Sequence, residues 1–400
     1  MWNQAIFPAL VALALLPHPA QAQLLDTLLP GTIPGYGQKF SVVAQHRQFA
    51  PGATGWNVDG ITAAPSVNLQ TGYDSAPGGS SASTTAQAIP SLLLTDPVAG
   101  FGLYAEANAA AYPQDAAQNT CTALLAGGER ITLPRETITL SAALLHGAAT
   151  GFAFDTAAIT SPIPFTLKNL RASDEISSGL FTLTPEFSLS RYDFAGSASS
   201  ANRTEQQEAA TLDFVSGGPV TAILQIGATQ LNYSLETQNA DIYELLTGAQ
   251  DKQDGLWTLS FLAGAAWRNP RIGPGLVAPI AEARADWQPT MLDKITLTAS
   301  HEIDDPDAIS ASPYTRTSIN LVISHEYLEN VTVQALTDIA IAQYVHMDLH
   351  EFLGTGELDM QWRATPALAL NGVYIFNTRQ ANEISAANEN VVMLGLTWTP

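Results

Sequence analysis

The stretch from Trp257 to Arg268, WTLSFLAGAAWR, has an apolar side chain at every odd position and a tryptophan at each end of that apolar face. A period of two predicts a β-strand, because successive side chains point to opposite faces. Ten steps of about 3.3 Å, tilted by about 40°, separate the two indoles by roughly 25 Å along a membrane normal, the height of the lipid-facing band of an outer-membrane barrel. The segment therefore predicts a strand that crosses a bilayer, with a half-buried strand of a soluble sandwich as the alternative.

The large aromatic residues of the C-terminal half decide between these alternatives. They are sorted by strand end, next to predicted short turns, at the C-terminus, or at the opposite edge of a strand. A soluble core has no reason to sort its indoles in this way, whereas a membrane interface does. The predicted aromatic girdle consists of Trp257, Trp267, Trp287, Tyr327, Trp362 and Trp398.

The N-terminus resembles a targeting segment. The first 22 residues contain no charged side chain and pass through an apolar core to the small-residue exit Ala20-Gln21-Ala22. This pattern predicts a signal peptide over residues 1–22. Residues 23–59 are Pro- and Gly-broken and are expected to form a periplasmic leader or a partial plug, followed by the barrel over residues 60–400. The uncharged window from Thr137 to Phe154 contains His146, Gly147, Thr150 and Gly151, which argues against a helical membrane anchor.

Charge excludes one class of partner. Sixteen Lys and Arg against 37 Asp and Glu give a net charge of -21, and an acidic surface repels nucleic acid. The excess of acidic side chains fits either a lumen that favours cations or a solvated acidic exterior. The single cysteine, Cys121, cannot form an internal disulfide and is expected to be a small apolar filler.

Turn-forming residues recur at a near-constant interval. Asp251–Gly255, Pro289–Asp293, Glu329-Asn330 and Thr365-Pro366 follow one another at 36 to 40 residues, and each interval holds two strands and one longer polar segment. Extending the spacing upstream places short turns near residues 217–219, 173–177, 133–134 and 96–97. Nine hairpins then predict an all-β, transmembrane, antiparallel up-and-down barrel of about 18 strands, with 16 as the alternative and both termini in the periplasm.

Two blocks of the sequence resemble an outer-membrane β-barrel porin family of the β-barrel porin 2 type, which is associated with exopolysaccharide export. The opening block runs from Gly52–Trp56 through Gly60–Val67 to Gly72-Tyr73-Asp74, and the second from Pro279 through Trp287–Thr290 to Asn390–Leu396. The resemblance implies a pore in the cell outer membrane of a Gram-negative bacterium, and some members serve polysaccharide export. These motifs are structural, so they support the fold more than the role.

Alternation predicts which polar side chains line the lumen. The candidates are Glu282, Arg284, Asp286, Glu302, Asp338, Glu357, Asp359, Gln361 and Arg363, with Asp293 counted on the same face. Any wide barrel must also fill its interior with polar groups for water, so the set indicates a conducting lumen and no single residue a site.

The sequence gives little support for metal binding or catalysis. Period-two alternation puts His346, Asp348 and His350 on one face, a weak metal candidate whose simpler reading is a hydrated strand end. Ser300-His301 and Ser324-His325 are sequence neighbours and point to opposite faces, so neither forms a nucleophile and base pair. The sequence therefore predicts no enzyme and no cofactor.

The predicted function is passage of a polar solute or polymer across the outer membrane. An accessory channel for exopolysaccharide export leads on the resemblance. A general diffusion porin for small hydrophilic solutes and a non-conducting surface or scaffold barrel are the alternatives. The expected partners are outer-membrane lipid, the barrel assembly machinery, polysaccharide and periplasmic export proteins, with no nucleic acid.

Overall fold

The structure is a computed structural model that describes residues 21–36, 55–152, 154, 161–253, 256–305, 312–345, 347–382 and 386–400. The helical elements are α1 (Gln21–Leu28) and the 3-10 turns η1 (Pro77–Gly79), η2 (Ala116–Gln118), η3 (Gly196–Ala201) and η4 (Glu236–Gln238). No helix among these described residues is long and apolar enough to cross a membrane.

The strands follow the predicted hairpin repeat. They are β1 (Trp56–Val58), β2 (Ile61–Asp74), β3 (Ser83–Asp96), β4 (Phe101–Ala111), β5 (Thr120–Thr132), β6 (Glu136–Ala149), β7 (Ile163–Ser178), β8 (Phe181–Phe194), β9 (Arg203–Val215) and β10 (Val220–Tyr233). They continue with β11 (Ala240–Gln253), β12 (Trp257–Pro270), β13 (Leu276–Thr290), β14 (Asp293–Asp304), β15 (Tyr314–Leu328), β16 (Val331–Tyr344), β17 (His350–Thr365), β18 (Leu368–Ala381) and β19 (Ala387–Trp398).

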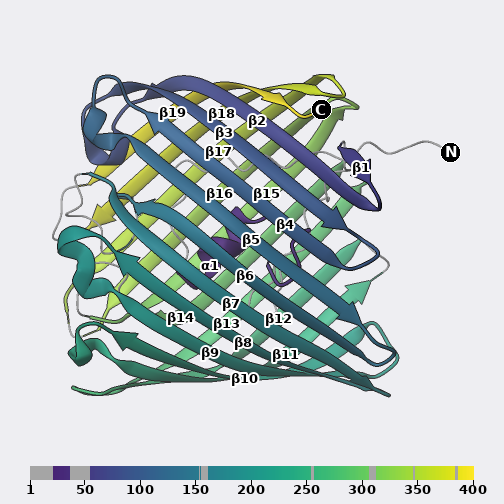
Figure 1. Cartoon of the computed structure of the whole chain (residues 1–400). Coiled ribbons are helices and arrows are strands. Elements are labelled where there is room, and N and C mark those ends of the chain that lie inside the picture. The colour runs from purple at the N-terminus through teal and green to yellow at the C-terminus, as the bar shows by residue number, and fades with distance from the viewer. Residues whose placement is uncertain are drawn as a thin grey trace.

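The sheet closes on itself. Strands β2 to β19 each pair antiparallel with the next in sequence, and β19 pairs with β2 from Val391↔Asp74 to Trp398↔Val67. Of the 19 strands in the sheet, β1 is a three-residue addition that pairs with the start of β2, so the closed ring holds 18. Figure 1 shows the tilted strands around α1, which lies inside the ring. The predicted 18-stranded up-and-down barrel is confirmed, and the alternative count of 16 is wrong.

Short turns lie at the end of the barrel where β2 begins and β19 ends, and longer loops lie at the other end. One predicted turn is misplaced. Residues 173–177 belong to β7, and the chain turns at Gly179-Leu180, where Gly179 has a φ of +63° that favours glycine. The polar run Ser173-Asp174-Glu175 has the composition of a turn. It can nevertheless belong to a strand, because both faces of a strand can meet water near its end.

Three of the longer loops close in the same way. In each, an asparagine just after a 3-10 turn accepts a hydrogen bond from the backbone N–H at the end of the preceding strand. The pairs are Asn119 with Tyr112 at 2.7 Å, Asn202 with Phe194 at 2.6 Å and Asn239 with Tyr233 at 2.7 Å. The side-chain carbonyl replaces the ladder partner that the backbone loses where the strand ends.

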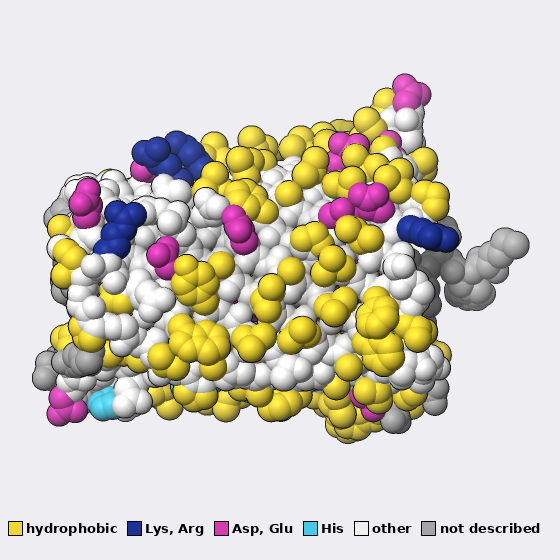
Figure 2. Space-filling view, turned by 90° about the horizontal axis from the view of Figure 1, so that it is seen from below, with side chains coloured by type: hydrophobic (Ala, Val, Ile, Leu, Met, Phe, Trp, Pro, Cys, Tyr) yellow, Lys and Arg dark blue, Asp and Glu magenta, His cyan; other side chains and the backbone are white. Residues whose placement is uncertain are grey.

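The outer wall is apolar through its middle. Outward side chains such as Leu394 (67% exposed), Phe261 (57%) and Ile226 (54%) would be costly to leave in water. Figure 2 shows hydrophobic side chains across the middle of the wall, with charged side chains mainly toward its two ends. This surface is compatible with a lipid bilayer and would be unfavourable in water.

Candidate functional site in the barrel interior

Side chains alternate between the outer wall and the interior along each strand. On β17, Leu358, Met360 and Trp362 are 44–51% exposed on the outer wall, so the residues between them point inward. By the same alternation and register, the interior positions include Glu282, Arg284, Asp286, Glu302, Asp338, Glu357, Asp359, Gln361 and Arg363. They are spread over β13, β14, β16 and β17, so they line a wall and do not converge on one point.

Asp293, which was expected in the lumen, lies on the outer face instead. It pairs with His325 in register, and their side chains lie 2.6 Å apart on the outer face at the short-turn end. A β-bulge between Trp287 and Thr290 shifts the register by one residue. Alternation from Trp287, or back from Leu297, places Asp293 on the outer face, so its inclusion among the lumen candidates is wrong.

Some of the interior candidates contact one another. Arg284 donates to Asp286 through Nε at 2.5 Å and Nη2 at 2.8 Å, and Thr296 donates to the same carboxylate at 2.8 Å. Both members of this ion pair are buried, so it is fixed scaffolding of the wall.

Other interior candidates engage residues that the sequence did not single out. Arg316 lies 3.9 Å from Glu302 and 3.9 Å from Asp304, while Asn320 donates to Asp338 at 3.2 Å. Gln361 donates to Asn371 at 3.1 Å. Nearer the loops, Arg268 Nη2 forms a salt bridge with Asp305 Oδ1 at 2.6 Å. This contact connects the start of the β14–β15 loop to the interior wall.

Interior charges are unevenly balanced. In the described strands, the inward basic side chains are Arg130, Arg171, Arg203, Lys252, Arg268, Arg284, Lys294, Arg316, Arg363 and Arg379. From β13 to β17, four of these face a larger set of inward carboxylates, Glu282, Asp286, Glu302, Asp304, Glu326, Asp338, Glu351, Glu357 and Asp359. This wall therefore attracts cations more than anions.

An N-terminal segment, residues 21–36, lies inside the ring against β4–β8. Leu25, Ile33 and Tyr36 are at most 2% exposed. The interior residues that form one apolar cluster with the segment are Tyr104, Leu124, Ala126, Ala143, Leu145, Ala149, Phe165, Leu167, Tyr192 and Phe194. The hydrophobic effect thus holds the segment on the wall and takes the centre of the wall out of water.

The backbone of the segment approaches the wall closely. A Cβ on Gly128 would meet the carbonyl oxygen of Pro34 at 2.3 Å, and one on Gly102 would meet Thr32 and Ile33 at 3.1 Å. Glycine at these two positions leaves space for the segment that another residue would fill.

Polar contacts anchor the segment as well. Arg171 on β7 donates to Asp26 through two nitrogens at 2.7 and 3.0 Å, and its guanidinium lies 4.8 Å from the ring centroid of Tyr36. Tyr36 donates to Asn169 at 3.0 Å. Burial raises the pKa of the Tyr36 phenol above its ordinary value, so the phenol remains a neutral donor. Segment and wall are joined by a buried network in which each partner depends on the other.

The sequence left open a periplasmic leader or a partial plug for residues 23–59, and it did not identify the wall that the segment contacts, although a signal was present. Strand β6 is apolar on both faces, outward at Leu140 and Leu144 and inward at Ala143 and Leu145. A strand between lipid and an open aqueous lumen should alternate apolar with polar. Apolar residues on both faces indicate that something covers the inner face.

A second inward element comes from the β6–β7 loop. Phe154 lies 5.6 Å from the ring of Tyr314 on β15, and the carbonyl of Gly151 accepts a hydrogen bond from Arg379 on β18. Strand β15 is nine positions beyond β6 in a ring of 18, which is half the circumference. The loop therefore reaches across the interior to the opposite wall.

The predicted girdle residues lie on the outer face. Trp257, Trp267, Trp287, Tyr327, Trp362 and Trp398 are 36–69% exposed. Trp257 and Trp287 stack with centroids 5.0 Å apart, as register partners on β12 and β13. Phe181 on β8 and Phe214 on β9 lie at the short-turn end with Trp257 and Trp287, and their rings are 5.2 Å apart.

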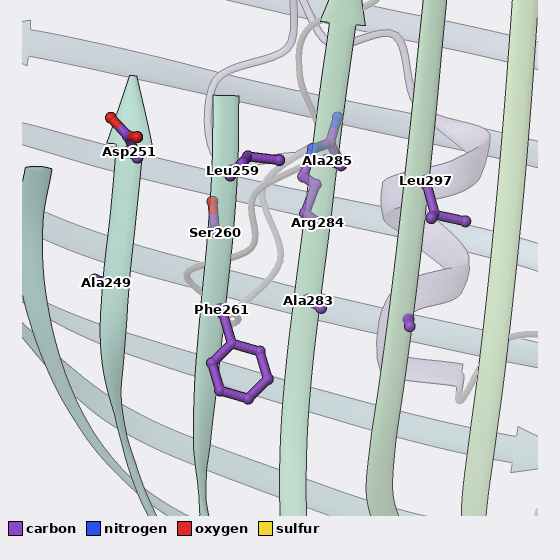
Figure 3. Close-up of a pocket in the computed structure, with 10 residues that line it drawn as sticks. Ala249, Asp251, Leu259, Ser260, Phe261, Ala283, Arg284, Ala285 and Leu297 are labelled. Carbon is purple, nitrogen blue, oxygen red and sulfur yellow. The ribbon is translucent and has the colours of Figure 1, made fainter. Parts of the chain in front are cut away.

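A hollow of about 380 Å³ lies on the lipid side of the wall (Figure 3). Alanines at 249, 283, 285 and 299 form its floor, and Leu259, Phe261 and Leu297 stand around it. Small outward side chains on neighbouring strands leave room for an acyl chain. The hollow is thus a feature of the membrane surface and does not belong to the transport path.

Of the three residues of the metal candidate, the structure describes Asp348 and His350. His346 lies outside the described residues, and Asp348 and His350 are 3.8 Å apart in an exposed loop end. In the part of the chain that is described, no group of three or more His, Cys, Asp or Glu side chains is arranged to hold a metal ion.

Comparison with known proteins extends the sequence resemblance. Residues 266–399 match the family model described as Putative beta-barrel porin 2, which confirms the resemblance over the C-terminal third of the chain. No curated protein matches the chain.

Several solved structures are similar in fold. OccK2 (OpdF) of Pseudomonas aeruginosa covers 86% of this chain and 98% of its own at 11% identity, with a TM-score of 0.47. OccK3 (OpdO) of the same organism covers 84% and 96% at 13% identity, with a TM-score of 0.47. OccAB4 of Acinetobacter baumannii covers 84% and 98% at 9% identity, with a TM-score of 0.43. Likeness of this degree shows the fold alone.

Proposed function

We propose that this chain is a porin of the Gram-negative outer membrane that passes small hydrophilic solutes, since residues 266–399 match the β-barrel porin 2 family and the closed barrel is apolar outside. The path is narrowed from inside by residues 21–36 on one wall and by the β6–β7 loop that reaches the opposite wall.

The buried contact between the N-terminal segment and β4–β8 carries this proposal. An unobstructed barrel of 16 to 18 strands encloses an aqueous channel wide enough for large solutes. Here the segment covers an apolar wall and the loop reaches across the interior. An extended polymer needs a continuous wide path, whereas a small solute needs only the remaining space.

The interior wall suits polar solutes, with a preference for cations and neutral hydroxylated molecules. Amide and carboxyl side chains such as Gln361, Asn371 and Asp338 can exchange hydrogen bonds between water and solute. Because such groups recur around the wall, no single residue is indispensable for passage. Selectivity then comes from the width of the path and from the excess of carboxylates.

Exopolysaccharide export is the second candidate, and the family resemblance favours it. For a glycan chain to pass, residues 21–36 would have to leave the wall, which breaks the Arg171 to Asp26 ion pair and exposes the apolar cluster. A passive pore supplies no energy for this step. Export would therefore depend on periplasmic or inner-membrane partners.

Liposome swelling with neutral sugars of increasing size tests the proposal. We expect purified protein to admit mono- and disaccharides at rates that fall steeply for longer oligosaccharides. A gene deletion should lower uptake of small hydrophilic nutrients and leave surface polysaccharide unchanged. Lost polysaccharide with normal nutrient uptake would favour export instead, and absence of any swelling would favour a scaffold barrel.

A further inference from the structure

The outer wall carries an unusual pair of basic side chains. Apart from the inward basic residues described above, the described strands contain two more, Lys168 on β7 and Arg191 on β8. These two are register partners, directly opposite each other. Their side chains are 60% and 63% exposed.

Their neighbours in sequence show that both point outward. Leu167 and Asn169, on either side of Lys168, face the N-terminal segment inside the ring. Ser190 and Tyr192, on either side of Arg191, also point inward, since Asn169 donates to Ser190 at 2.8 Å and Tyr192 belongs to the interior cluster. Alternation therefore places Lys168 and Arg191 on the membrane side.

Their height matches the outer edge of the apolar belt. On β8, Phe181 marks the short-turn edge, and Arg191 follows ten residues later. On β12, Trp257 and Trp267 are also ten residues apart and mark the two edges of the belt. Arg191 thus stands at the level where β12 has its upper tryptophan, at the long-loop end. A barrel whose short turns face the periplasm has its outer-leaflet headgroups at this level.

Other polar groups surround the pair. Asp193 lies 3.2 Å from Arg191 Nε and 3.8 Å from Lys168 Nζ, so one carboxylate is shared by two cations. His146 and Thr166 lie beside them, 3.4 Å apart, on β6 and β7. Glu208 on β9 is hydrogen-bonded by Gln206 at 2.8 Å and lies further down the wall. The cluster of Lys168, Arg191 and Asp193 keeps an excess of positive charge in a chain of net charge -21.

We propose that Lys168 and Arg191 bind a phosphate group of the glycolipid in the outer leaflet of the outer membrane. Two exposed cations at headgroup height match a phosphate dianion, and guanidinium to phosphate hydrogen bonds are among the stronger charge-assisted pairs. Without lipid, Asp193 pairs with both cations, so it competes with the phosphate for them. The site depends on the membrane location of the barrel and not on the solute that it transports.

Binding of purified glycolipid by the folded protein in detergent tests the proposal, read by native mass spectrometry. The probes are bisphosphorylated lipid A and the same lipid A after removal of both phosphates. We expect the wild type to bind the phosphorylated form about tenfold more tightly. In the double variant Lys168→Gln with Arg191→Gln the two forms should bind equally.

Two further variants make the result specific. Asp193→Asn removes the shared carboxylate and should tighten binding of the phosphorylated form. Lys252→Gln with Arg363→Gln removes the same charge from the interior and should leave binding unchanged. Heat-modifiable mobility on gel electrophoresis verifies folding of each variant. Equal binding of both lipids by the wild type overturns the proposal. The proposal is also overturned if the double variant still prefers the phosphorylated lipid but loses self-association in lipid-free detergent, because the two cations would then contact a second copy of the protein.

Discussion

Arg171 and Asp26 join the barrel wall to the N-terminal segment through two parallel hydrogen bonds of 2.7 and 3.0 Å, with side chains only 7% and 3% exposed. The two residues are 145 positions apart in the sequence. Their pairing means that the wall of β7 and residues 21–36 stabilise each other.

Replacing Arg171 by alanine should release the segment from the wall. Removing one partner of a buried ion pair costs about 3–5 kcal/mol, because the other charge stays buried without compensation. We expect higher single-channel conductance in planar bilayers. Arg191→Ala, an outward position on the neighbouring strand, is the matched control and should conduct like the wild type. Unchanged conductance in Arg171→Ala would show that the segment does not narrow the path.

Gly128 and Gly127 provide a second, independent pair. Gly128→Ala would place a methyl group 2.3 Å from the carbonyl oxygen of Pro34, so the segment must move away from β5. On the other face of the strand, Gly127→Ala meets a side-chain methyl of Leu103 at 3.2 Å and the carbonyl oxygen of Gly102 at an ordinary contact distance of 3.5 Å. Limited proteolysis should cut residues 21–36 faster in Gly128→Ala than in Gly127→Ala. Equal cleavage rates would contradict the close contact.

The two faces of β15 should differ in their tolerance of charge. Ile319 is outward and 47% exposed, and Ile319→Lys should destabilise the barrel by about 2–4 kcal/mol near the middle of the membrane. Asn320 is the next residue, points inward and donates to Asp338 at 3.2 Å. Asn320→Lys should therefore be tolerated. Urea unfolding in lipid vesicles measures both, and equal losses would mean that the register of β15 is wrong.

The excess of inward carboxylates predicts a cation-selective pore. Reversal potentials under a salt gradient should indicate cation preference, and Glu302→Gln with Asp338→Asn should reduce it. An anion-selective reversal potential in the wild type would show that the carboxylates of β13 to β17 do not set the field in the conducting path.

Trp257 and Trp287 should stabilise each other beyond their separate contacts with lipid. Their stacked rings, 5.0 Å apart, predict a coupling of about 0.5–1.5 kcal/mol in a double-mutant cycle to alanine. The free energy of unfolding of the two single variants and the double variant measures this coupling. Additive losses would argue against direct ring contact in the membrane.

The sequence by itself determined the barrel and its lipid-facing side, and it narrowed the strand count to 18 or 16. Lipid and water sort side chains on alternate positions, so residues such as Leu358 and Trp362 are assigned to a face by local pattern alone. The turn after β7 escaped that logic because Ser173-Asp174-Glu175 resembles a loop in composition, while Gly179 makes the turn through its backbone conformation. Asp293 follows that logic, since alternation places it on the outer face with Leu297, and its inclusion among the lumen candidates departed from the pattern.

Only the tertiary structure decided what lies inside the barrel. Alternation gives the inward direction of Arg171 and Leu145, but the partner of each comes from a segment more than 100 residues away in the chain. The close approach of Pro34 to Gly128 and the reach of Phe154 to Tyr314 likewise depend on closure of the ring, which brings distant residues together in space. A local pattern records the environment of a side chain, apolar or polar, and not the identity of the atoms that create it.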